Sequence, residues 1–189
     1  MAERELAREP GSTVIHNLIT SKAVPEIIRE NGGEPVRTRV GHSFIKAKMA
    51  ETNAVFGGEH SAHYYFRDFW RADSGMLAAM HVLAALGQQD KPLSEMMAKY
   101  NRYAASGEIN SRLDSAEAQA DRTEAVVKAF ADRAENVDRL DGVTVELKDG
   151  NWFNVRASNT EPLLRLNVEA DTQEAVDALV KEILAIIRA

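Results

Sequence analysis

Residues 156–165 read Arg-Ala-Ser-Asn-Thr-Glu-Pro-Leu-Leu-Arg, a polar segment between two apolar runs. The flanking residues 151–155 and 163–168 alternate apolar and polar side chains, which is typical of strands. Pro162 favours an extended backbone at Glu161, so the far side of the loop is expected to be stiff. The sequence therefore predicts two antiparallel strands joined by a polar loop.

This loop is rich in hydrogen-bond donors. Ser158 and Thr160 supply hydroxyl groups, and Arg156 supplies five N–H donors in a planar fork. Asn159 tolerates left-handed dihedral angles, which can turn backbone amides inward. Donors beside a fixed positive charge suit a phosphate. On residue types alone, an ordinary polar hairpin loop with a solvated arginine is the simpler interpretation, because Ser, Asn and Thr are common in turns.

The first half of the chain alternates predicted strands with predicted helices. Strands are expected at residues 13–16, 35–40 and 53–58, and helices at 22–30, 43–51 and 75–86. This alternation predicts an α/β unit with a largely parallel sheet, whose ligands bind at the carboxyl ends of the strands. The aromatic run at 64–70 is interpreted as a strand and the edge of the core. The predicted inward face of the helix at 75–86 consists of Met76, Leu77, Met80, Leu83 and Ala84.

The second half predicts a small antiparallel sheet backed by two helices, an α+β unit. A helix capped by Ser115 is expected to reach about Glu135, and a helix capped by Thr172 ends the chain. Asp149-Gly150 is a hairpin signal between the strands at 143–147 and 151–155. The predicted domains are residues 1–98 and 99–189.

Composition excludes several classes of function. The 189-residue chain has a net charge of −6, which argues against a general nucleic-acid binder. It has no cysteine, so disulfides and thiolate metal sites are excluded. Neither a signal peptide nor an apolar run of membrane-spanning length is found. The expectation is a cytoplasmic protein with no nucleic-acid or membrane partner.

A second polar segment, Gly58-Glu59-His60-Ser61-Ala62-His63, follows a predicted strand directly. Glycine permits a sharp turn there, and a glutamate can accept hydrogen bonds from two adjacent hydroxyls, as on the edge of a sugar ring. A solvated loop is the competing interpretation. Two histidines and a glutamate also suggest a metal, but His60 and His63 lack the i, i+4 spacing of a zinc helix, so no metal site is expected.

These segments resemble three motifs of the α-D-phosphohexomutases, and most closely those of the bacterial phosphomannomutase/phosphoglucomutase group. The string R-A-S-N-T-E-P-L-L-R resembles the family's phosphate-binding loop. G-E-H-S-A-H resembles its sugar-binding loop, G-E-x-S-G-H, with Ala62 in place of the second glycine. Residues 41–46, Gly-His-Ser-Phe-Ile-Lys, resemble its G-H-S-x-I-K segment, whose histidine faces the active cleft.

The resemblance implies a fold and a set of site residues. Residues 1–98 would be the three-layer αβα third domain, and residues 99–189 a smaller α+β fourth domain similar to the TATA-box-binding protein. The implied sugar-binding residues are Gly58, Glu59, Ser61 and His42. The implied phosphate-binding residues are Arg156, Ser158, Asn159, Thr160 and Arg165.

The resemblance also implies an activity, the interconversion of hexose 1-phosphates and hexose 6-phosphates of glucose and mannose through a phosphoserine and a 1,6-bisphosphate. The family's phosphoserine loop, T-A-S-H-N-P, and magnesium loop, D-G-D-x-D-R, do not occur in this sequence. Both belong to the first two domains, which are expected to lie before Met1. No catalytic residue is therefore expected here, and Mg²⁺ and the activator hexose 1,6-bisphosphate are expected to act in the whole enzyme.

Two alternatives stay open. The chain could be a stand-alone sugar-phosphate-binding module without catalysis. It could also be a fragment of a phosphoglucosamine mutase, whose loops resemble R-x-S-G-T-E-P and G-E-Q-S-G-H. Asn159 and His60 differ from those two patterns.

Overall fold

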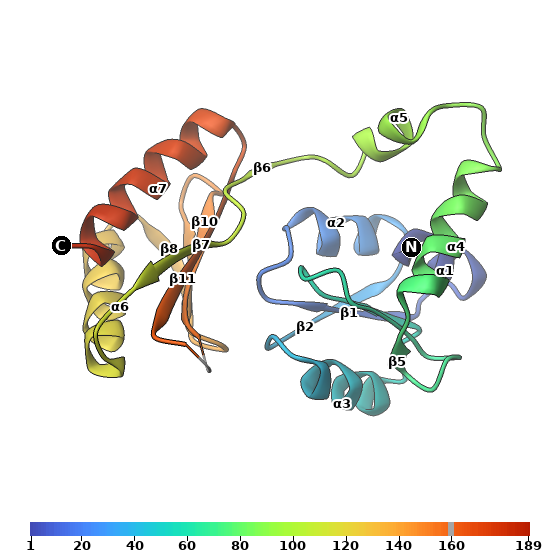
Figure 1. Ribbon diagram of the computed structural model, residues 1–189. Helices are drawn as coiled ribbons and strands as arrows, with labels where there is room; N and C mark the ends of the chain where they lie inside the picture. The colour runs from blue at the N-terminus through green and yellow to red at the C-terminus, as the bar shows by residue number, and fades with distance from the viewer. Residues whose placement is uncertain (159–160) are drawn as a thin grey trace. The chain divides into compact units, whose positions relative to one another are not determined.

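A computed structural model describes residues 1–158 and 161–189 of the chain. They form two compact units, Met1–Arg102 and Tyr103–Ala189 (Figure 1). Each unit has its own sheet and its own hydrophobic core. Residues 159 and 160, both predicted to bind phosphate, lie outside the described residues.

The first unit is a mixed sheet with helices on both faces. Its strands are Thr13–Asn17 (β1), Glu34–Thr38 (β2), Phe56–Gly58 (β3), Tyr64–Phe66 (β4) and Ala72–Asp73 (β5). Its helices are Ala2–Arg8 (α1), Ala23–Glu30 (α2), His42–Thr52 (α3), Gly75–Leu86 (α4) and Leu93–Ala98 (α5). The strand order is β2-β1-β3-β4-β5, with β1, β2 and β3 parallel and the last two strands antiparallel.

Packing against this sheet produces three layers. On one face, Leu6 of α1, Ile28 of α2 and Ala78 of α4 pack with residues of β1, β3 and β4. On the other face, Ile45 and Met49 of α3 are buried with residues of β1 and β4. Figure 1 shows α2 and α3 on opposite sides of the sheet. The predicted αβα domain is confirmed.

The strand order also locates the ligand-binding edge of this sheet. The chain passes from β1 to β2 on one side, and then crosses back to β3 on the other side of β1. The carboxyl ends of β1 and β3 therefore flank a switch point, where open α/β sheets bind ligands. Asn17 ends β1 and Gly58 ends β3, so the segment that begins at Glu59 leaves the sheet at this point.

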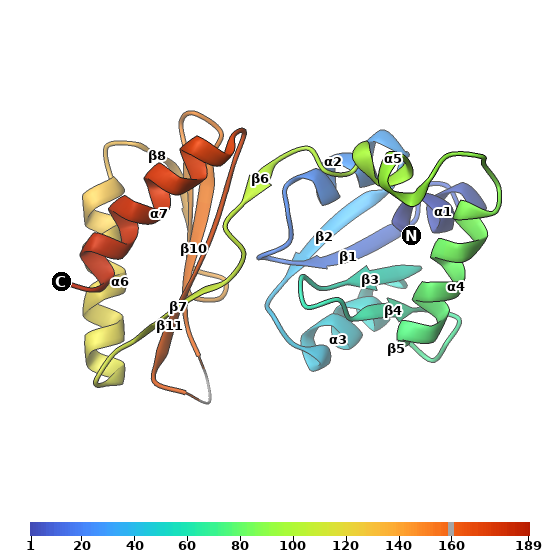
Figure 2. The same cartoon turned by 45° about the horizontal axis from the view of Figure 1, so that its top comes forward.

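The second unit is an antiparallel sheet covered on one face by two helices (Figure 2). Its strands are Ala104–Ala105 (β6), Ile109–Arg112 (β7), Ala134–Asp138 (β8), Val143–Leu147 (β9), Trp152–Ala157 (β10) and Leu163–Ala170 (β11). Its helices are Ala116–Phe130 (α6) and Gln173–Ile187 (α7). The strand order is β6-β11-β10-β9-β8, and β7 also pairs with β11.

Alternation along the two central strands divides this sheet into an apolar and a polar face. Phe153 and Val155 of β10, with Leu164 and Leu166 of β11, are buried in the core under α6 and α7. Because successive side chains point to opposite faces, the residues between them lie on the other face. Arg156 and Arg165 are two of these residues. The predicted α+β unit, its Asp149-Gly150 hairpin and the caps at Ser115 and Thr172 are confirmed.

Several predicted element boundaries are wrong. Helix α6 ends at Phe130, not near Glu135, because residues 131–133 turn and Ala134 pairs with Leu147 of β9. Pairing with a neighbouring strand outweighs the helix propensity of the alanine and glutamate residues there. Strand β3 begins at Phe56, not Asn53, which instead ends α3 in a left-handed conformation. Strand β2 ends at Thr38, two residues before the predicted end.

The predicted inward face of α4 is also wrong. Met76, Met80 and Leu83 are 74%, 58% and 65% exposed, and Ala84 is exposed as well. The helix instead buries Ala78, with Leu77 packed beside it. Apolar residues occur on every side of α4, so their spacing along the sequence cannot identify the side that packs against the sheet.

None of the helices in the described residues has the length and apolar character needed to cross a membrane.

Candidate functional site

The segment after β3 forms a tight loop at the switch point. The backbone N–H of Glu59 donates to the carbonyl of His63 at 3.0 Å, and the N–H of Ala62 donates to the carbonyl of Glu59 at 3.1 Å. The side-chain oxygen of Asn17, at the end of β1, accepts from the N–H of His60 at 3.4 Å. Ala62 has φ of 64°, a left-handed conformation that favours glycine. The loop is therefore fixed by main-chain bonds, with strain at one residue.

Glu59 is a buried carboxylate in this loop, with 6% of the residue exposed. Its Oε1 accepts from the N–H of Gly41 at 3.0 Å, and its Oε2 accepts from the hydroxyl of Tyr65 at 2.7 Å. Both donors are neutral. Each carboxylate oxygen has a second lone pair, so Glu59 can accept further hydrogen bonds from a ligand while its orientation is fixed.

Tyr65 connects Glu59 to His42. The tyrosine is fully buried in β4, and its hydroxyl lies 2.8 Å from Nδ1 of His42, the first residue of α3. Since the hydroxyl hydrogen is donated to Glu59, the hydroxyl oxygen accepts from an Nδ1–H of His42. Burial, followed by the hydrogen bond to Glu59, raises the pKa of Tyr65 well above its usual value. The tyrosine is therefore a neutral bridge between the two side chains.

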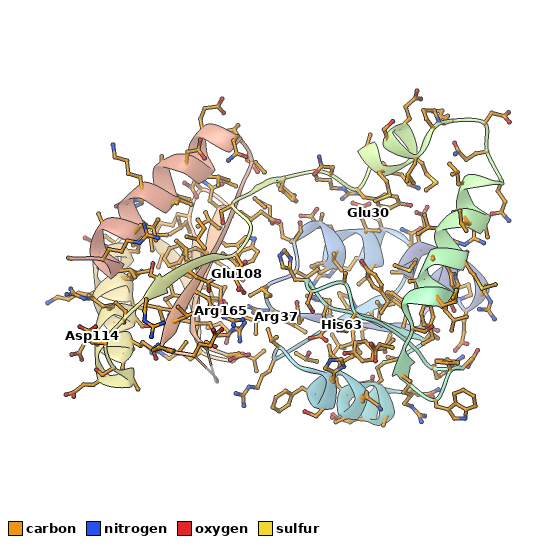
Figure 3. All side chains as sticks on the ribbon, in the orientation of Figure 1. Glu30, Arg37, His63, Glu108, Asp114 and Arg165 are labelled. Carbon is orange, nitrogen blue, oxygen red and sulfur yellow. The ribbon has the colours of Figure 1, made fainter. Side chains whose placement is uncertain are left out.

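His63 and Ser61 lie beside this group. The Ser61 hydroxyl is 2.9 Å from Nδ1 of His63, and the His63 ring meets the His42 ring edge-on at 4.6 Å between centroids. His63 is one of the residues drawn and labelled in Figure 3. The structure thus brings His42, Glu59 and Ser61, three of the predicted sugar-binding residues, into one cluster, and Gly58 ends the strand that carries it.

Sequence reasoning missed the role of Tyr65. The aromatic run at 64–70 predicts only a strand and the edge of the core. A buried tyrosine hydroxyl needs a hydrogen-bond partner. That requirement is a usable signal, because Tyr65 lies in a strand next to a loop that contains a glutamate.

In the second unit, Arg156 is a buried cation on the polar face of β10. Only 7% of the residue is exposed, and its Nε has no hydrogen-bond partner among the described residues. No described acidic side chain pairs with it. Gly142 leaves room for the backbone of Arg156. A Cβ on residue 142 would lie 2.4 Å from the carbonyl of Val155 and 2.8 Å from Cα of Arg156. An uncompensated buried guanidinium favours an anionic ligand.

Arg165 lies directly opposite Arg156 across the β10–β11 pair. Its NH2 group donates to the Ser158 hydroxyl at 3.3 Å, and its guanidinium lies 3.6 Å from a Glu108 carboxylate oxygen. Figure 3 labels Arg165 and Glu108, which come from β11 and from the residue just before β7. Glu161 also lies 3.9 Å from Arg165, so Arg165 has acidic neighbours. Like charges opposite each other on a sheet are destabilising, and an anionic ligand would offset the repulsion between the two arginines. The structure brings together Arg156, Arg165 and Ser158 of the predicted phosphate-binding residues.

One group of side chains in the first unit has the composition of a metal site. Single ligand atoms of His42, Glu59 and His63 all lie within 4.8 Å of one another. Magnesium prefers six oxygen ligands, so two imidazoles and one carboxylate do not fit it. Among the described residues, this group therefore offers no site for the Mg²⁺ that the resemblance implies.

Comparison with protein families gives matches over nearly the whole chain. The sequence model of phosphoglucomutase/phosphomannomutase alpha/beta/alpha domain III matches residues 1–103. The model of the phosphoglucomutase/phosphomannomutase C-terminal domain matches residues 108–186.

Individual relatives agree with these matches. A protein named as phosphohexose mutases from Xanthomonas campestris pv. campestris is 42% identical over 89% of this chain and 37% of its own length. A phosphomannomutase from Methanocaldococcus jannaschii is 40% identical over 99% of this chain and 40% of its own length. The crystal structure of a phosphoglucomutase/phosphomannomutase family protein from Burkholderia thailandensis superposes with a TM-score of 0.81 at 30% identity, over 99% of this chain and 40% of that one. The chain thus spans about two fifths of the length of these relatives.

Proposed function

Because this chain belongs to the phosphoglucomutase/phosphomannomutase family, with the domains of that family at residues 1–103 and 108–186, we propose that it recognises hexose phosphates. The first unit binds the sugar hydroxyls, and the second binds the phosphate. The chain does so as part of an enzyme that interconverts hexose 1-phosphates and hexose 6-phosphates through a phosphoserine and a 1,6-bisphosphate intermediate.

The buried Arg156 is the observation that carries this proposal. A guanidinium with 7% exposure and no described acidic partner is costly unless an anion completes the site. Arg165 on the opposite strand and the Ser158 hydroxyl add donors at the same place. Guanidinium groups bind phosphate oxygens with a planar pair of N–H bonds, so a phosphate ester is the matching ligand. Asn159 and Thr160 are proposed to add further donors.

Glu59 supports the sugar half of the proposal. Gly41 and Tyr65 fix the orientation of its carboxylate, while each oxygen keeps a lone pair for a ligand hydroxyl. A carboxylate held this way can accept from two adjacent hydroxyls. We assign it the 3- and 4-hydroxyls, which glucose and mannose share. Ser61 and His42 border the same position.

The proposal leaves the phosphoryl-transfer chemistry to other domains. Neither the phosphoserine loop nor the magnesium loop of the family occurs in this sequence. Mg²⁺ and hexose 1,6-bisphosphate are therefore proposed to act in the whole enzyme, and no residue described here is assigned to either. A stand-alone binding module predicts the same ligand binding without any partner domain. A phosphoglucosamine mutase fragment predicts preference for a 2-amino sugar.

A titration of the ¹⁵N-labelled chain tests the proposal. Glucose 1-phosphate and glucose 6-phosphate should both shift the amide resonances of Glu59 and Arg156, with millimolar affinity, because one 189-residue chain buries less of the ligand than a whole enzyme. In a coupled assay with Mg²⁺ and a bisphosphate, the chain alone should show no mutase turnover. Glucosamine phosphates should bind no better than glucose phosphates.

Variants separate the two halves of the site. Arg156→Ala should lose about 2 kcal/mol or more of phosphate binding, which raises a millimolar Kd roughly 30-fold and out of the measurable range. Arg139→Ala is the matched control, because Arg139 is an exposed arginine of the same unit that pairs with Glu124. Glu59→Ala should weaken the binding of glucose phosphates and of mannose phosphates to the same extent. Unchanged binding in Arg156→Ala would remove the basis of the phosphate assignment.

A further inference from the structure

We propose that His42, Glu59 and His63 form a binding site for a divalent transition metal of the zinc type. These residues come from the start of α3 and from the loop after β3. Their ligand atoms all lie within 4.8 Å of one another. The spacing of His60 and His63 alone does not indicate a metal site, and His42 lies outside their loop.

The composition of the cluster matches an open zinc site. Zinc sites that keep an exchangeable position use three protein ligands, and two histidines with one glutamate are a known set. Zinc lies roughly 2.0–2.2 Å from such ligands, so tetrahedral ligand atoms are roughly 3.3–3.6 Å apart. The ligand atoms, up to 4.8 Å apart, must therefore approach one another by up to roughly 1.2–1.5 Å when a zinc ion binds. The space for this movement exists, because His42 is exposed and His63 is only partly buried.

Hydrogen bonds already prepare both imidazoles for a metal. A metal-binding histidine normally donates its second ring N–H to an oxygen, which fixes the tautomer. Nδ1 of His42 lies 2.8 Å from the Tyr65 hydroxyl and 3.8 Å from Asp73 Oδ1. Nδ1 of His63 lies 2.9 Å from the Ser61 hydroxyl. When each Nδ1 donates to its oxygen partner, Nε2 of the ring is left to bind the metal.

The charge of Glu59 favours a cation at the same place. Its carboxylate is buried, and it accepts hydrogen bonds from the neutral N–H of Gly41 and the neutral hydroxyl of Tyr65. A metal would supply the positive charge that these donors do not. Imidazole suits zinc, copper and nickel, whereas magnesium prefers oxygen ligands, so the site should select against magnesium.

Metal binding at this cluster would exclude the sugar. Glu59 and His42 are the groups proposed to face sugar hydroxyls, so this step rests on the proposed function. A bound zinc ion would occupy the lone pairs of Glu59 that the hydroxyls need. Zinc and the hexose phosphate should therefore compete for the first unit.

Calorimetric titration of the 189-residue chain with ZnCl₂ tests the site directly, without an activity assay. One equivalent of Zn²⁺ should bind, and Mg²⁺ should bind at least 100-fold more weakly. His42→Ala and His63→Ala should each lower the affinity for Zn²⁺ at least 10-fold. Tyr65→Phe should lower it roughly 10–100-fold, because the hydrogen bond that orients His42 is lost. The matched control is His60→Ala, since His60 is an exposed histidine of the same loop. It should bind Zn²⁺ as the parent chain does.

Amide spectra of each variant show whether it is folded, and Co²⁺ bound in place of Zn²⁺ should give the intense visible absorption of a tetrahedral ion. Zinc affinity that survives both His42→Ala and His63→Ala would overturn the proposal, as would an equal loss in His60→Ala. Zinc binding that follows the expected pattern supports the site whether or not glucose 6-phosphate competes. Failure of that competition counts only against the sugar assignment, so the two proposals can fail separately.

Discussion

Replacing Tyr65 by phenylalanine removes one hydroxyl from the centre of the first unit. That hydroxyl lies 2.7 Å from Glu59 Oε2 and 2.8 Å from His42 Nδ1, within a fully buried side chain. A hydrogen bond to a charged group contributes roughly 1.5–3 kcal/mol, and its loss leaves a buried carboxylate oxygen with one donor fewer. We expect Tyr65→Phe to lower the free energy of unfolding of this unit by about 2 kcal/mol.

Urea denaturation, followed through amide resonances of residues 1–102, measures this loss for the first unit alone, since the two units need not unfold together. The neighbouring Tyr64→Phe is the control. Tyr64 is only partly buried and stacks on Phe56, so its hydroxyl should contribute little.

A double-mutant cycle identifies the partner. If Tyr65 acts through the charge of Glu59, Tyr65→Phe should cost about 1 kcal/mol less in a Glu59→Gln background, where only a neutral acceptor remains. A loss below about 0.5 kcal/mol in the single variant, or additive losses in the double variant, would refute the reasoning.

Two further predictions concern the same unit. Burial lowers the pKa of His16 from 6.5 to about 4. As the pH falls, the unfolded state therefore takes up this proton before the folded state does. The contribution of His16 to the free energy of unfolding is complete above pH 6.5 and falls by about 3 kcal/mol as the pH drops toward 4. Unfolding measured from pH 7 to 4 should show this decrease, and an equal decrease in a His16→Gln variant would contradict it. Ala62 has φ of 64°, a conformation that costs a non-glycine residue roughly 1–2 kcal/mol. Ala62→Gly should remove this strain, although the greater freedom of glycine in the unfolded chain offsets part of the gain. The variant should therefore stabilise the unit by about 0.5 kcal/mol, and a lower unfolding midpoint in urea would show that the strain is absent.

The parallel part of the first sheet could be predicted from alternating strands and helices, and the centre of the second from its hairpin signals, because both depend on local patterns. Two failures have a common cause, a local pattern that permits more than one outcome. Helix α4 is apolar on all sides, so its spacing could not show that Ala78 packs while Met76 and Met80 are exposed. Ala134 and Glu135 have good helix propensity, but their position is decided by pairing with β9, which is a contact between separate segments.

The candidate sites show the same limit. Each motif could be recognised as a string, but the contacts between motifs could not. His42 and Glu59 are 17 residues apart in sequence, and in the structure the hydroxyl of Tyr65, a residue of an aromatic strand, connects them. Arg156 and Arg165 lie opposite each other because of the register of β10 and β11, and the polar string between the two strands does not reveal that register.

The two units have opposite electrostatic deficits, and the proposed function assigns a different part of the ligand to each of them. In the first unit, a buried carboxylate receives hydrogen bonds from neutral donors. In the second, a buried guanidinium has no described acidic partner and faces a second arginine. A free hexose offers hydroxyl donors for the first site only, and inorganic phosphate offers an anion for the second only. A hexose phosphate offers both, so under the proposed function each half contributes to affinity by a separate interaction. Glucose and mannose differ at the 2-hydroxyl, whereas the groups assigned to Glu59 are the 3- and 4-hydroxyls. The same argument therefore predicts that a chain using these contacts does not discriminate between the two sugars.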